Sequence, residues 1–443
     1  MLSNLKANQN YSIFFLFFSI FYYLLFKYLV IDYNLENNNL LHSDQFKYWK
    51  LSNFLIENKF IFDEKFGSLR VPLYPLFLSF IKLISDNIYF IIFIQSIIGI
   101  LNIFIISKIY FLIQKKMNIY LFVFSLVNIN LLNSSTFILT EAIFLTFFLL
   151  YIYFFLKLVY LRENKIKNDL IYILFCALFL GLSTLTRPIA FYYSIIFVVI
   201  FLKEISLLKK ISYILLFIIS FSVALAPWNL RNLHYFDSYK LTTSVSDNLI
   251  GYYLPYIKSN EEKISLAQAK KEVYSKENMK IIESKDENIK INFFKNNIKD
   301  VKLTSFVETW IEGGLKLLLT PSVVETFYNL KVPKDSFSKI KEKYFLNKAK
   351  IYILENSNKL FSIMMIISLL VGIFLKLIVS IFIFSNFKKY KKLNIIFLLL
   401  LFTTLALVGP LGSARYRLIF EPFLIIYLVL LLDNFKKIKF FEK

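Results

Sequence analysis

Arginine is scarce in this chain, so its positions indicate where specific anion-binding chemistry is expected. Only six of the 52 basic residues are arginines, and lysine supplies the rest of the positive charge. A guanidinium group is always charged and presents a planar fork that binds phosphate or carboxylate through paired hydrogen bonds, whereas lysine acts as a point charge. We therefore expect arginine where such a fork is needed. The six are Arg70, Arg162, Arg187, Arg231, Arg415 and Arg417.

Carboxylates that suit acid–base chemistry or ion pairing lie near the ends of apolar stretches. Asp44 begins an amphipathic stretch in the segment His-Ser-Asp-Gln-Phe-Lys-Tyr-Trp, and it is interpreted either as a helix N-cap or as a general base. Glu141 opens an apolar stretch, where a charge is costly unless it faces a cavity or a partner. Glu421 follows Arg417 by four residues and is placed for a helical ion pair.

Some of the arginines have a plainer interpretation than ligand binding. Arg70 and Tyr74 lie in the rigid segment Arg-Val-Pro-Leu-Tyr-Pro and are typical of an interfacial anchor pair, although this chain normally uses lysine for anchoring. Arg187, in Thr-Arg-Pro, is either a turn residue or half of an ion pair. Arg162 lies in a short basic loop and is interpreted as ordinary loop charge. We expect Arg70 and Arg417 first as phosphate ligands, and Arg187 last.

Composition places the chain among polytopic membrane proteins. Hydrophobic residues make up 57% of the sequence, above the roughly 45–50% of ordinary soluble domains. The net charge of +22 comes largely from lysines clustered in short loops between apolar stretches, which is the positive-inside pattern rather than a nucleic-acid-binding groove. The single cysteine, Cys176, lies in an apolar stretch and permits neither an intrachain disulfide nor a cysteine-based metal site.

The short basic loops orient about ten predicted membrane crossings. They are assigned to the cytoplasm, which also places both termini there, and they lie near residues 115, 162, 203, 388 and 436. The run 71–84 is too short for a crossing and contains two prolines, so it is predicted as an interfacial helix. The predicted crossings are residues 11–31, 87–113, 118–134, 137–160, 169–186, 189–202, 211–227, 359–384, 393–411 and 416–433.

Two polar segments remain on the outer side of the membrane in this topology, namely residues 32–86 and the longer, Lys/Glu-rich segment 228–358. Helical spacing predicts an amphipathic surface helix in the second, through Leu303, Phe306, Val307, Trp310 and Ile311. The expected fold is an all-α polytopic membrane protein. Its predicted units are a transmembrane core in residues 1–235, an outer helical segment in residues 236–358, and C-terminal crossings with a basic tail in residues 359–443.

The order of the short motifs resembles the GT-C superfamily of membrane glycosyltransferases, nearest the branch with protein O-mannosyltransferases and the lipid A aminoarabinose transferase. The motifs fall in order within residues 40–425 and share one side of the membrane in the predicted topology. They are S-D-x-x-x-Y-W, R-x-P-x-Y-P-L-F, L-T-E-x-x-F-L, L-T-R-P, P-W-x-x-R-N and R-Y-R-x-x-x-E-P. The segment 228–358 carries little of the resemblance beyond its first residues.

The resemblance implies transfer of a sugar from a polyprenyl-phosphate donor to an acceptor hydroxyl of a glycan, lipid or protein at the outer face of a bacterial inner membrane. Asp44 matches the family's acidic residue in the first outer loop and is expected to act as the base, whereas Gln45 stands where members often have a second acid. A single displacement with inversion is expected. No cofactor is expected to be required, and a divalent metal is possible.

The remaining candidate residues are given roles on the same basis, because arginine forks would stabilise the charge of a leaving lipid phosphate. Binding of the donor phosphate is expected of Arg70, Tyr74, Arg231, Arg415 and Arg417. Cavity lining or ion pairing is expected of Glu141, Arg187 and Glu421. The expected partners are the lipid-linked donor, the acceptor and membrane lipids, without nucleic acid. His42 and His234 with Asp44 would be a metal site, but their spacing does not match a usual ligand motif.

Three alternatives share some of these features. A transporter or flippase of lipid-linked sugars would also use outer arginines, but it needs polar groups on both membrane faces and often shows an internal repeat. A polysaccharide polymerase shares the substrate class and a large outer loop. A non-catalytic scaffold leaves the outer set of arginines and carboxylates without an explanation.

Overall fold

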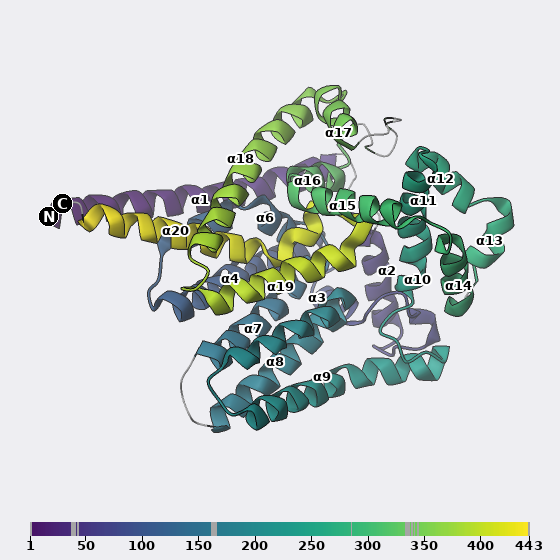
Figure 1. Ribbon diagram of the computed structural model, residues 1–443, viewed down its shortest axis with the longest axis horizontal. Coiled ribbons are helices and arrows are strands. Elements are labelled where there is room, and N and C mark those ends of the chain that lie inside the picture. The colour runs from purple at the N-terminus through teal and green to yellow at the C-terminus, as the bar shows by residue number, and fades with distance from the viewer. Residues whose placement is uncertain are drawn as a thin grey trace.

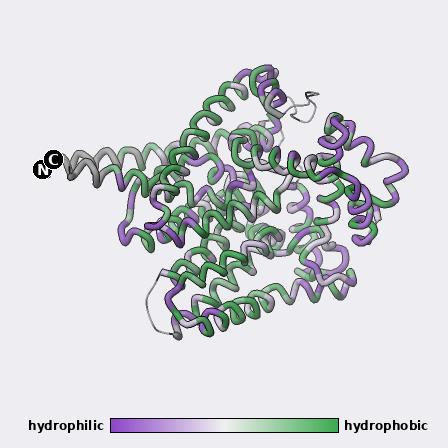
Figure 2. The backbone as a smooth tube through the Cα atoms, viewed as in Figure 1, coloured by the Kyte–Doolittle hydropathy of each residue, from purple (hydrophilic) through white to green (hydrophobic). Residues whose placement is uncertain are grey.

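Long apolar helices and a set of short helices at one end build the whole structure. The computed structural model describes residues 2–36, 41, 44–160, 166–284, 286–332, 337, 340, 342 and 345–441, and these residues form helices without a strand. In Figure 1 the short helices between residues 244 and 298 gather at the right-hand end, opposite the two chain termini. Figure 2 shows hydrophilic residues concentrated at that end and in loops, with hydrophobic residues along the long helices.

Seven helices among the described residues are long and apolar enough to cross a membrane, so the chain is a polytopic helical membrane protein. They coincide with seven of the predicted crossings. The seven are α1 (Leu2–Glu36), α4 (Ile88–Gln114), α7 (Glu141–Tyr160), α8 (Ile166–Thr186), α9 (Leu207–Phe236), α18 (Lys359–Ser385) and α19 (Lys391–Val408).

The crossing predicted as one helix over 118–134 is a bent pair. Helices α5 (Ile119–Val127) and α6 (Ile129–Thr136) meet at an angle of 63° at Asn128, whose backbone is extended. The Asn128 side chain accepts a hydrogen bond from the Leu131 N–H at 3.0 Å and so caps α6. Counting the pair as one span gives up to eight spans within the described part of the chain. The local capping bond explains why an apolar run of sufficient length is broken here.

Two further predicted crossings remain predictions. The stretch η2 (Pro188–Leu202) has 15 residues in 3-10 geometry, and at a rise of about 2.0 Å per residue it reaches about 30 Å, the thickness of a hydrocarbon core. Helix α20 (Glu421–Phe441) is long enough to cross, but it carries several charged residues and is not among the seven.

Shorter helices connect the long ones and form the end of the molecule that carries the site. The run 71–84 contains only the ten-residue α3 (Leu73–Lys82), which is too short to span a bilayer as an α-helix. The short elements are α2 (Asp44–Glu57), η1 (Glu64–Phe66), α10 (Ser244–Asn248), η3 (Leu249–Tyr253), α11 (Leu254–Glu262), α12 (Leu266–Val273), α13 (Lys276–Ile282), α14 (Glu287–Ile298), α15 (Leu303–Leu319), α16 (Val323–Asn329), α17 (Phe345–Leu354), η5 (Gly409–Leu411) and η6 (Ala414–Ile419).

Helix α7 is the centre of the largest apolar core. Within its span 72% of the residues are buried inside the protein, compared with 17% in α18. The core around α7 includes side chains from α4, α8, η2, α9, α19 and α20. The low burial of α18 indicates a helix whose apolar side chains face lipid, whereas α7 is held on all sides by other helices. A charged residue at the end of α7 is therefore held in a fixed position.

The predicted amphipathic helix is α15, and it packs with its backbone directly on the turn that follows α19. A Cβ atom added at Gly313 of α15 would lie 1.8 Å from the carbonyl oxygen of Gly409, and one added at Gly412 would lie 1.8 Å from the carbonyl oxygen of Gly313. Both positions are therefore limited to glycine. Gly409 also has a φ of 49°, which glycine adopts without steric cost.

We expect Gly313→Ala to destabilise the protein by about 2 kcal/mol or more, since the added methyl group overlaps a backbone carbonyl and overpacking typically costs about 1–3 kcal/mol. Gly314→Ala is the matched control on the same helix, because its methyl group would meet only the flexible end of Leu405 at 3.3 Å. Thermal unfolding of the purified protein in detergent measures both. Equal midpoints for the two variants would contradict a close backbone contact at Gly313.

Candidate functional site

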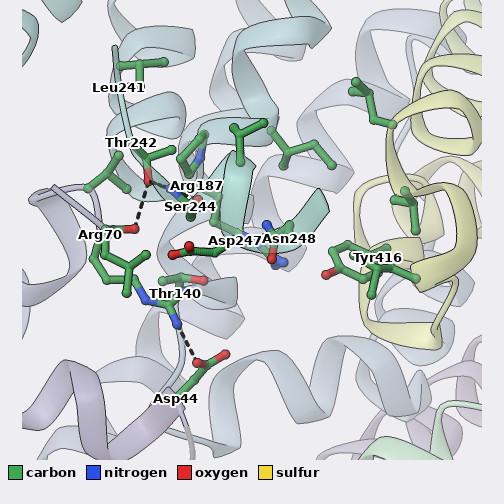
Figure 3. Close-up of a pocket in the computed structure, with 18 of the residues that line it drawn as sticks. Asp44, Arg70, Thr140, Arg187, Leu241, Thr242, Ser244, Asp247, Asn248 and Tyr416 are labelled. Carbon is green, nitrogen blue, oxygen red and sulfur yellow. Dashed lines mark hydrogen bonds and ion pairs between the residues drawn. The ribbon is translucent and has the colours of Figure 1, made fainter. Parts of the chain in front are cut away.

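A cavity of about 1510 Å³ lies between the long helices and the short helices at one end of the molecule. It receives side chains from segments far apart in the sequence, as Figure 3 shows for Asp44, Arg70, Asp247 and Tyr416. The lining comes from residues within 44–48, 69–71, 139–140, 186–192, 221–229, 239–253, 270–274, 325–329 and 406–416. The size is sufficient for a substrate larger than a simple metabolite.

Asp44 is held between two arginines at one end of this cavity. One carboxylate oxygen accepts a hydrogen bond from Arg70 at 2.7 Å, and the other lies 3.5 Å from Nη1 of Arg415. All three side chains are between a quarter and a third exposed. The carboxylate thus faces two arginines, which the N-cap interpretation does not predict.

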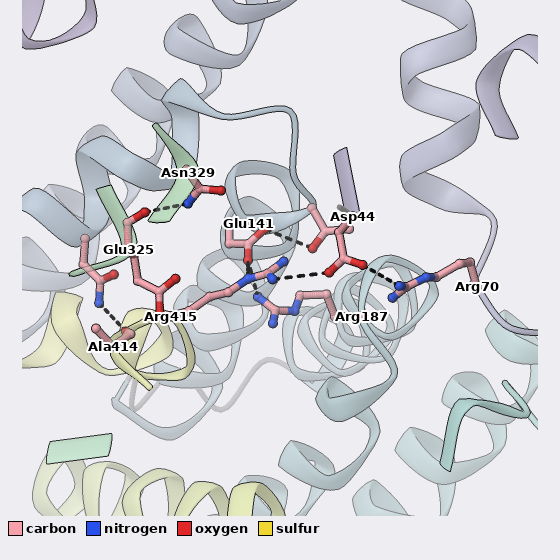
Figure 4. Close-up of polar contacts among 10 residues, drawn as sticks. Asp44, Arg70, Glu141, Arg187, Glu325, Asn329, Ala414 and Arg415 are labelled. Atoms are coloured by element: carbon pink, nitrogen blue, oxygen red, sulfur yellow. Dashed lines mark hydrogen bonds and ion pairs between the residues drawn. The ribbon is translucent and has the colours of Figure 1, made fainter. Parts of the chain in front are cut away.

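Glu141 forms the buried half of the same network (Figure 4). Its Oε1 atom accepts hydrogen bonds from Arg187, at 3.1 Å, and from Nε of Arg415. Its Oε2 atom accepts the hydroxyl of Thr140 at 3.2 Å. The Glu141 side chain is only 5% exposed, so removal of its partners would leave an uncompensated buried charge. Arg415 contacts both carboxylates and therefore joins Asp44 to Glu141.

The network carries an excess of positive charge and of hydrogen-bond donors. Three guanidinium groups face two carboxylates, which leaves one net positive charge. Nε of Arg70 is buried and has no hydrogen-bond partner, an uncommon state for a charged group in a folded protein. The surplus positive charge lies at the cavity wall and suits an anion, since guanidinium groups bind phosphate through paired, charge-assisted hydrogen bonds.

Local structure explains why these side chains point to one place. Asp44 lies in the first turn of α2 and Glu141 in the first turn of α7, where the helix dipole favours a negative charge. Arg187 directly precedes η2, and Arg415 lies in η6. Arg70 precedes α3, whose start is fixed by two prolines. The network is therefore built from the ends of five elements.

Tyr74 lies behind the cavity rather than in it. Its side chain is fully buried, and its hydroxyl donates to the side-chain oxygen of Gln95 at 2.7 Å. Gln95 in turn donates to the carbonyl oxygen of Phe137 at 2.8 Å, and the amide of Ile138 donates to Gln45 at 3.2 Å. These bonds hold the segment before Glu141 against α2, α3 and α4. Tyr74 and Gln45 thus position the network, and a phosphate-binding role for Tyr74 has no support from its surroundings.

Arg417 and Glu421 form a second, separate ion pair outside the cavity lining. The Nε atom of Arg417 lies 2.6 Å from Glu421, and the rest of its guanidinium group donates to the carbonyl oxygens of Leu317 and Thr320 and to the hydroxyl of Ser322. The Arg417 side chain is 5% exposed. The expectation that ranks it, with Arg70, first as a phosphate ligand has no support from these contacts. Its donors instead bind carbonyl oxygens at the C-terminal end of α15.

The hydrogen-bond donors of Arg231 are likewise used by backbone carbonyl groups. Its guanidinium group donates to the carbonyl oxygens of Phe62, at 3.0 Å, and Gly67, at 2.9 Å, and also to that of Asp63. It does not line the cavity. Arg231 therefore holds the 62–67 loop to α9. Arg187, which the sequence ranks last, lines the cavity and pairs with Glu141.

Residues of the segment 236–358 also line the cavity, and short-motif reasoning missed them. They include Asp247, Tyr252 and Tyr328. Burial raises the pKa of the Tyr252 phenol, and Tyr416 and Asp44 raise that pKa further, so the phenol keeps its proton and can donate a hydrogen bond. These residues belong to no local motif, and only the high tyrosine content of the chain (29 residues) gives a signal.

A metal site has no support among the residues that the structure describes. No group of three or more His, Cys, Asp or Glu side chains there is arranged to hold a metal ion. His234 lies on α9 with an exposed side chain. His42 and Arg162 lie outside the described residues.

Comparison with family models, with curated proteins and with solved structures finds no match for this chain.

We expect Arg417→Lys to lower the stability of the protein by roughly 2–3 kcal/mol, since a lysine cannot replace the several hydrogen bonds that the buried guanidinium makes and unsatisfied buried groups are costly. Arg70→Lys is the control, because that side chain lies at the cavity surface. Thermal unfolding midpoints in detergent measure the difference. A wild-type midpoint for Arg417→Lys, with weakened binding of a polyprenyl phosphate, would restore Arg417 as a phosphate ligand.

Proposed function

We propose that the protein is a membrane glycosyltransferase that moves a sugar from a polyprenyl-phosphate donor to an acceptor hydroxyl. The observation that carries this proposal is the placement of Asp44 between Arg70 and Arg415 at one end of a large cavity. The arrangement supplies both a carboxylate for a proton and guanidinium groups for a phosphate. The resemblance of the short motifs to the GT-C superfamily points in the same direction.

In the proposed complex the donor phosphate binds Arg70 and Arg415. A phosphate would compete with Asp44 for the same guanidinium groups, those of Arg70 and Arg415. Arg187 keeps Glu141 paired when Arg415 turns to the phosphate. The Asp44 carboxylate is then released from its two ion pairs and becomes free to accept a proton.

The proposed reaction is a single displacement at the anomeric carbon. The acceptor hydroxyl oxygen forms a bond to that carbon as its proton passes to Asp44, and the bond from the carbon to the phosphate oxygen breaks. The lipid phosphate leaves with the electron pair and needs no proton. Arg70 and Arg415 stabilise its developing charge, which is the role that preorganised cationic donors play in group transfer. The sugar is transferred with inversion.

The proposed orientation places the cavity on the outer face of a bacterial inner membrane and both termini in the cytoplasm. It rests on the positive-inside distribution of the short lysine-rich loops. It also agrees with the position of the short hydrophilic helices at the end of the bundle opposite the termini.

We expect Asp44→Asn to reduce sugar transfer by a factor of about 100 to 10,000, the usual contribution of a positioned general base. Asp300→Asn is a matched control on the exposed surface, and it should transfer at the wild-type rate. The assay supplies the purified protein with polyprenyl-phosphate sugars and a mixture of glycan, lipid and peptide acceptors. Full activity of Asp44→Asn would remove Asp44 as the base. Movement of the lipid-linked sugar across a vesicle membrane without transfer would favour a flippase.

The orientation is tested by cysteine labelling, because the chain has one cysteine and it is buried. In a Cys176→Ala background, Lys299→Cys lies at an exposed site of the short-helix end and Lys388→Cys at an exposed site between α18 and α19. A membrane-impermeant maleimide should label only the first in intact spheroplasts and both after lysis. Labelling of the second alone in intact spheroplasts would invert the orientation.

A further inference from the structure

The two ends of the cavity differ in chemistry. One end holds the arginine network around Asp44. The other end, called the roof here, consists of the cavity-lining residues within 239–274 and 325–329. The roof is rich in tyrosine, which packs a flat apolar face and offers a polar hydroxyl. Its tyrosines are Tyr239, Tyr252, Tyr253, Tyr274 and Tyr328.

The roof is fixed to the rest of the protein. The Tyr253 hydroxyl donates to the carbonyl oxygen of Leu407, and the indole N–H of Trp310 donates to the carbonyl oxygen of Ala406 at 3.2 Å. Their rings pack edge to face, with centroids 5.7 Å apart. Tyr253 lies in η3, one turn of π-helix, a distortion that is frequent at functional sites. The roof is thus largely preformed, as ligand sites usually are.

Tyr252, the neighbour of this anchor, has one ring contact within the cavity lining, with the Lys270 ammonium 5.8 Å from the ring centroid. It lines the cavity and is 45% exposed. Asp44, Arg70 and Tyr416 are among the groups that influence the pKa of its phenol, and all three line the same cavity as Tyr252. A ligand stacked on Tyr252 would therefore extend toward Asp44.

The roof has no net charge, in contrast to the arginine end, because its lining contains two lysines and two carboxylates, namely Lys240, Lys270, Asp247 and Glu325. Asp247 pairs with Lys290 at 2.7 Å, and Lys240 pairs with Glu287 at 2.6 Å. Figure 3 shows Asp247 between Arg70 and Tyr416. A carboxylate accepts hydrogen bonds from ligand hydroxyl groups but repels a ligand anion. The roof therefore suits a hydroxyl-rich ligand without net charge.

We propose that the roof is the acceptor site and that it binds a neutral carbohydrate, with Tyr252 stacked against a sugar ring and Asp247 and Glu325 accepting its hydroxyl hydrogens. The role of the roof as an acceptor site rests on the proposed function, whereas its binding of a neutral sugar does not. Sugar rings present C–H faces that pack on aromatic rings and edges of hydroxyl groups that need partners, which matches the roof. An anionic group placed against Asp247 and Glu325 would be repelled.

The test measures binding of sugars to the full-length protein in lipid nanodiscs by saturation-transfer NMR. The probes are neutral di- to tetrasaccharides of hexoses and N-acetylhexosamines, the same sugars with a uronic acid unit, and a Ser/Thr-rich peptide. We expect binding of neutral sugars. Tyr252→Ala should weaken it by about fivefold to tenfold, while Tyr252→Phe, which keeps the ring, should stay within about twofold of wild type. Tyr28→Ala, at an exposed site of α1 outside the cavity lining, is the control for loss of a tyrosine.

The outcomes separate this proposal from the proposed function. Absence of binding by every neutral sugar, stronger binding of the acidic sugars or the peptide, or unchanged binding by a folded Tyr252→Ala protein would overturn the carbohydrate site. Sugar binding by a wild-type protein that transfers no sugar would overturn the proposed function and leave the carbohydrate site standing.

Discussion

The buried carboxylate of Glu141 is the charge on which the cavity depends. It lies at the start of α7, the membrane helix with the most buried span, and its side chain is 5% exposed. An uncompensated charge at such a position costs several kcal/mol, so Arg187 and Arg415 are held against it. Because Arg415 also reaches Asp44, the requirement to neutralise Glu141 places a second carboxylate and a third guanidinium group at the cavity wall. The electrostatic balance of a membrane helix thereby assembles the candidate site.

A second constraint holds α15 against the turn that follows α19. The glycine contact between α15 and the turn after α19 brings two backbones together, and Arg417 closes the end of α15 with a set of backbone and side-chain bonds. Arg417 lies only two residues after Arg415. The same turn therefore carries one arginine at the cavity and another that binds the end of α15.

The cavity that results has two chemically different ends, and this difference supports a two-substrate reaction. Surplus guanidinium donors suit a phosphate, whereas paired charges and tyrosine rings suit a neutral, hydroxyl-rich ligand. Asp44 lies on the side where both would meet. A simple channel or scaffold does not require such an asymmetry, and a transporter has no need for a carboxylate between two arginines.

The sequence by itself determined the membrane class, seven of the long spans and the residue types at the site, because helix length, hydropathy and charge are local properties. The rarity of arginine directed attention to Arg70 and Arg415, which the structure places beside Asp44. It ranked Arg417 first and Arg187 last, although the side-chain chemistry of these two residues is the same. Only the tertiary structure decided that Arg187 faces Glu141 in the cavity while Arg417 is used by backbone carbonyls of α15. The roof residues could also not be predicted from the sequence, since their placement depends on contacts between segments more than 150 residues apart, such as that from Tyr253 to Leu407. A guanidinium group bonds whichever oxygens the fold brings near it, and that choice is made by packing rather than by sequence spacing.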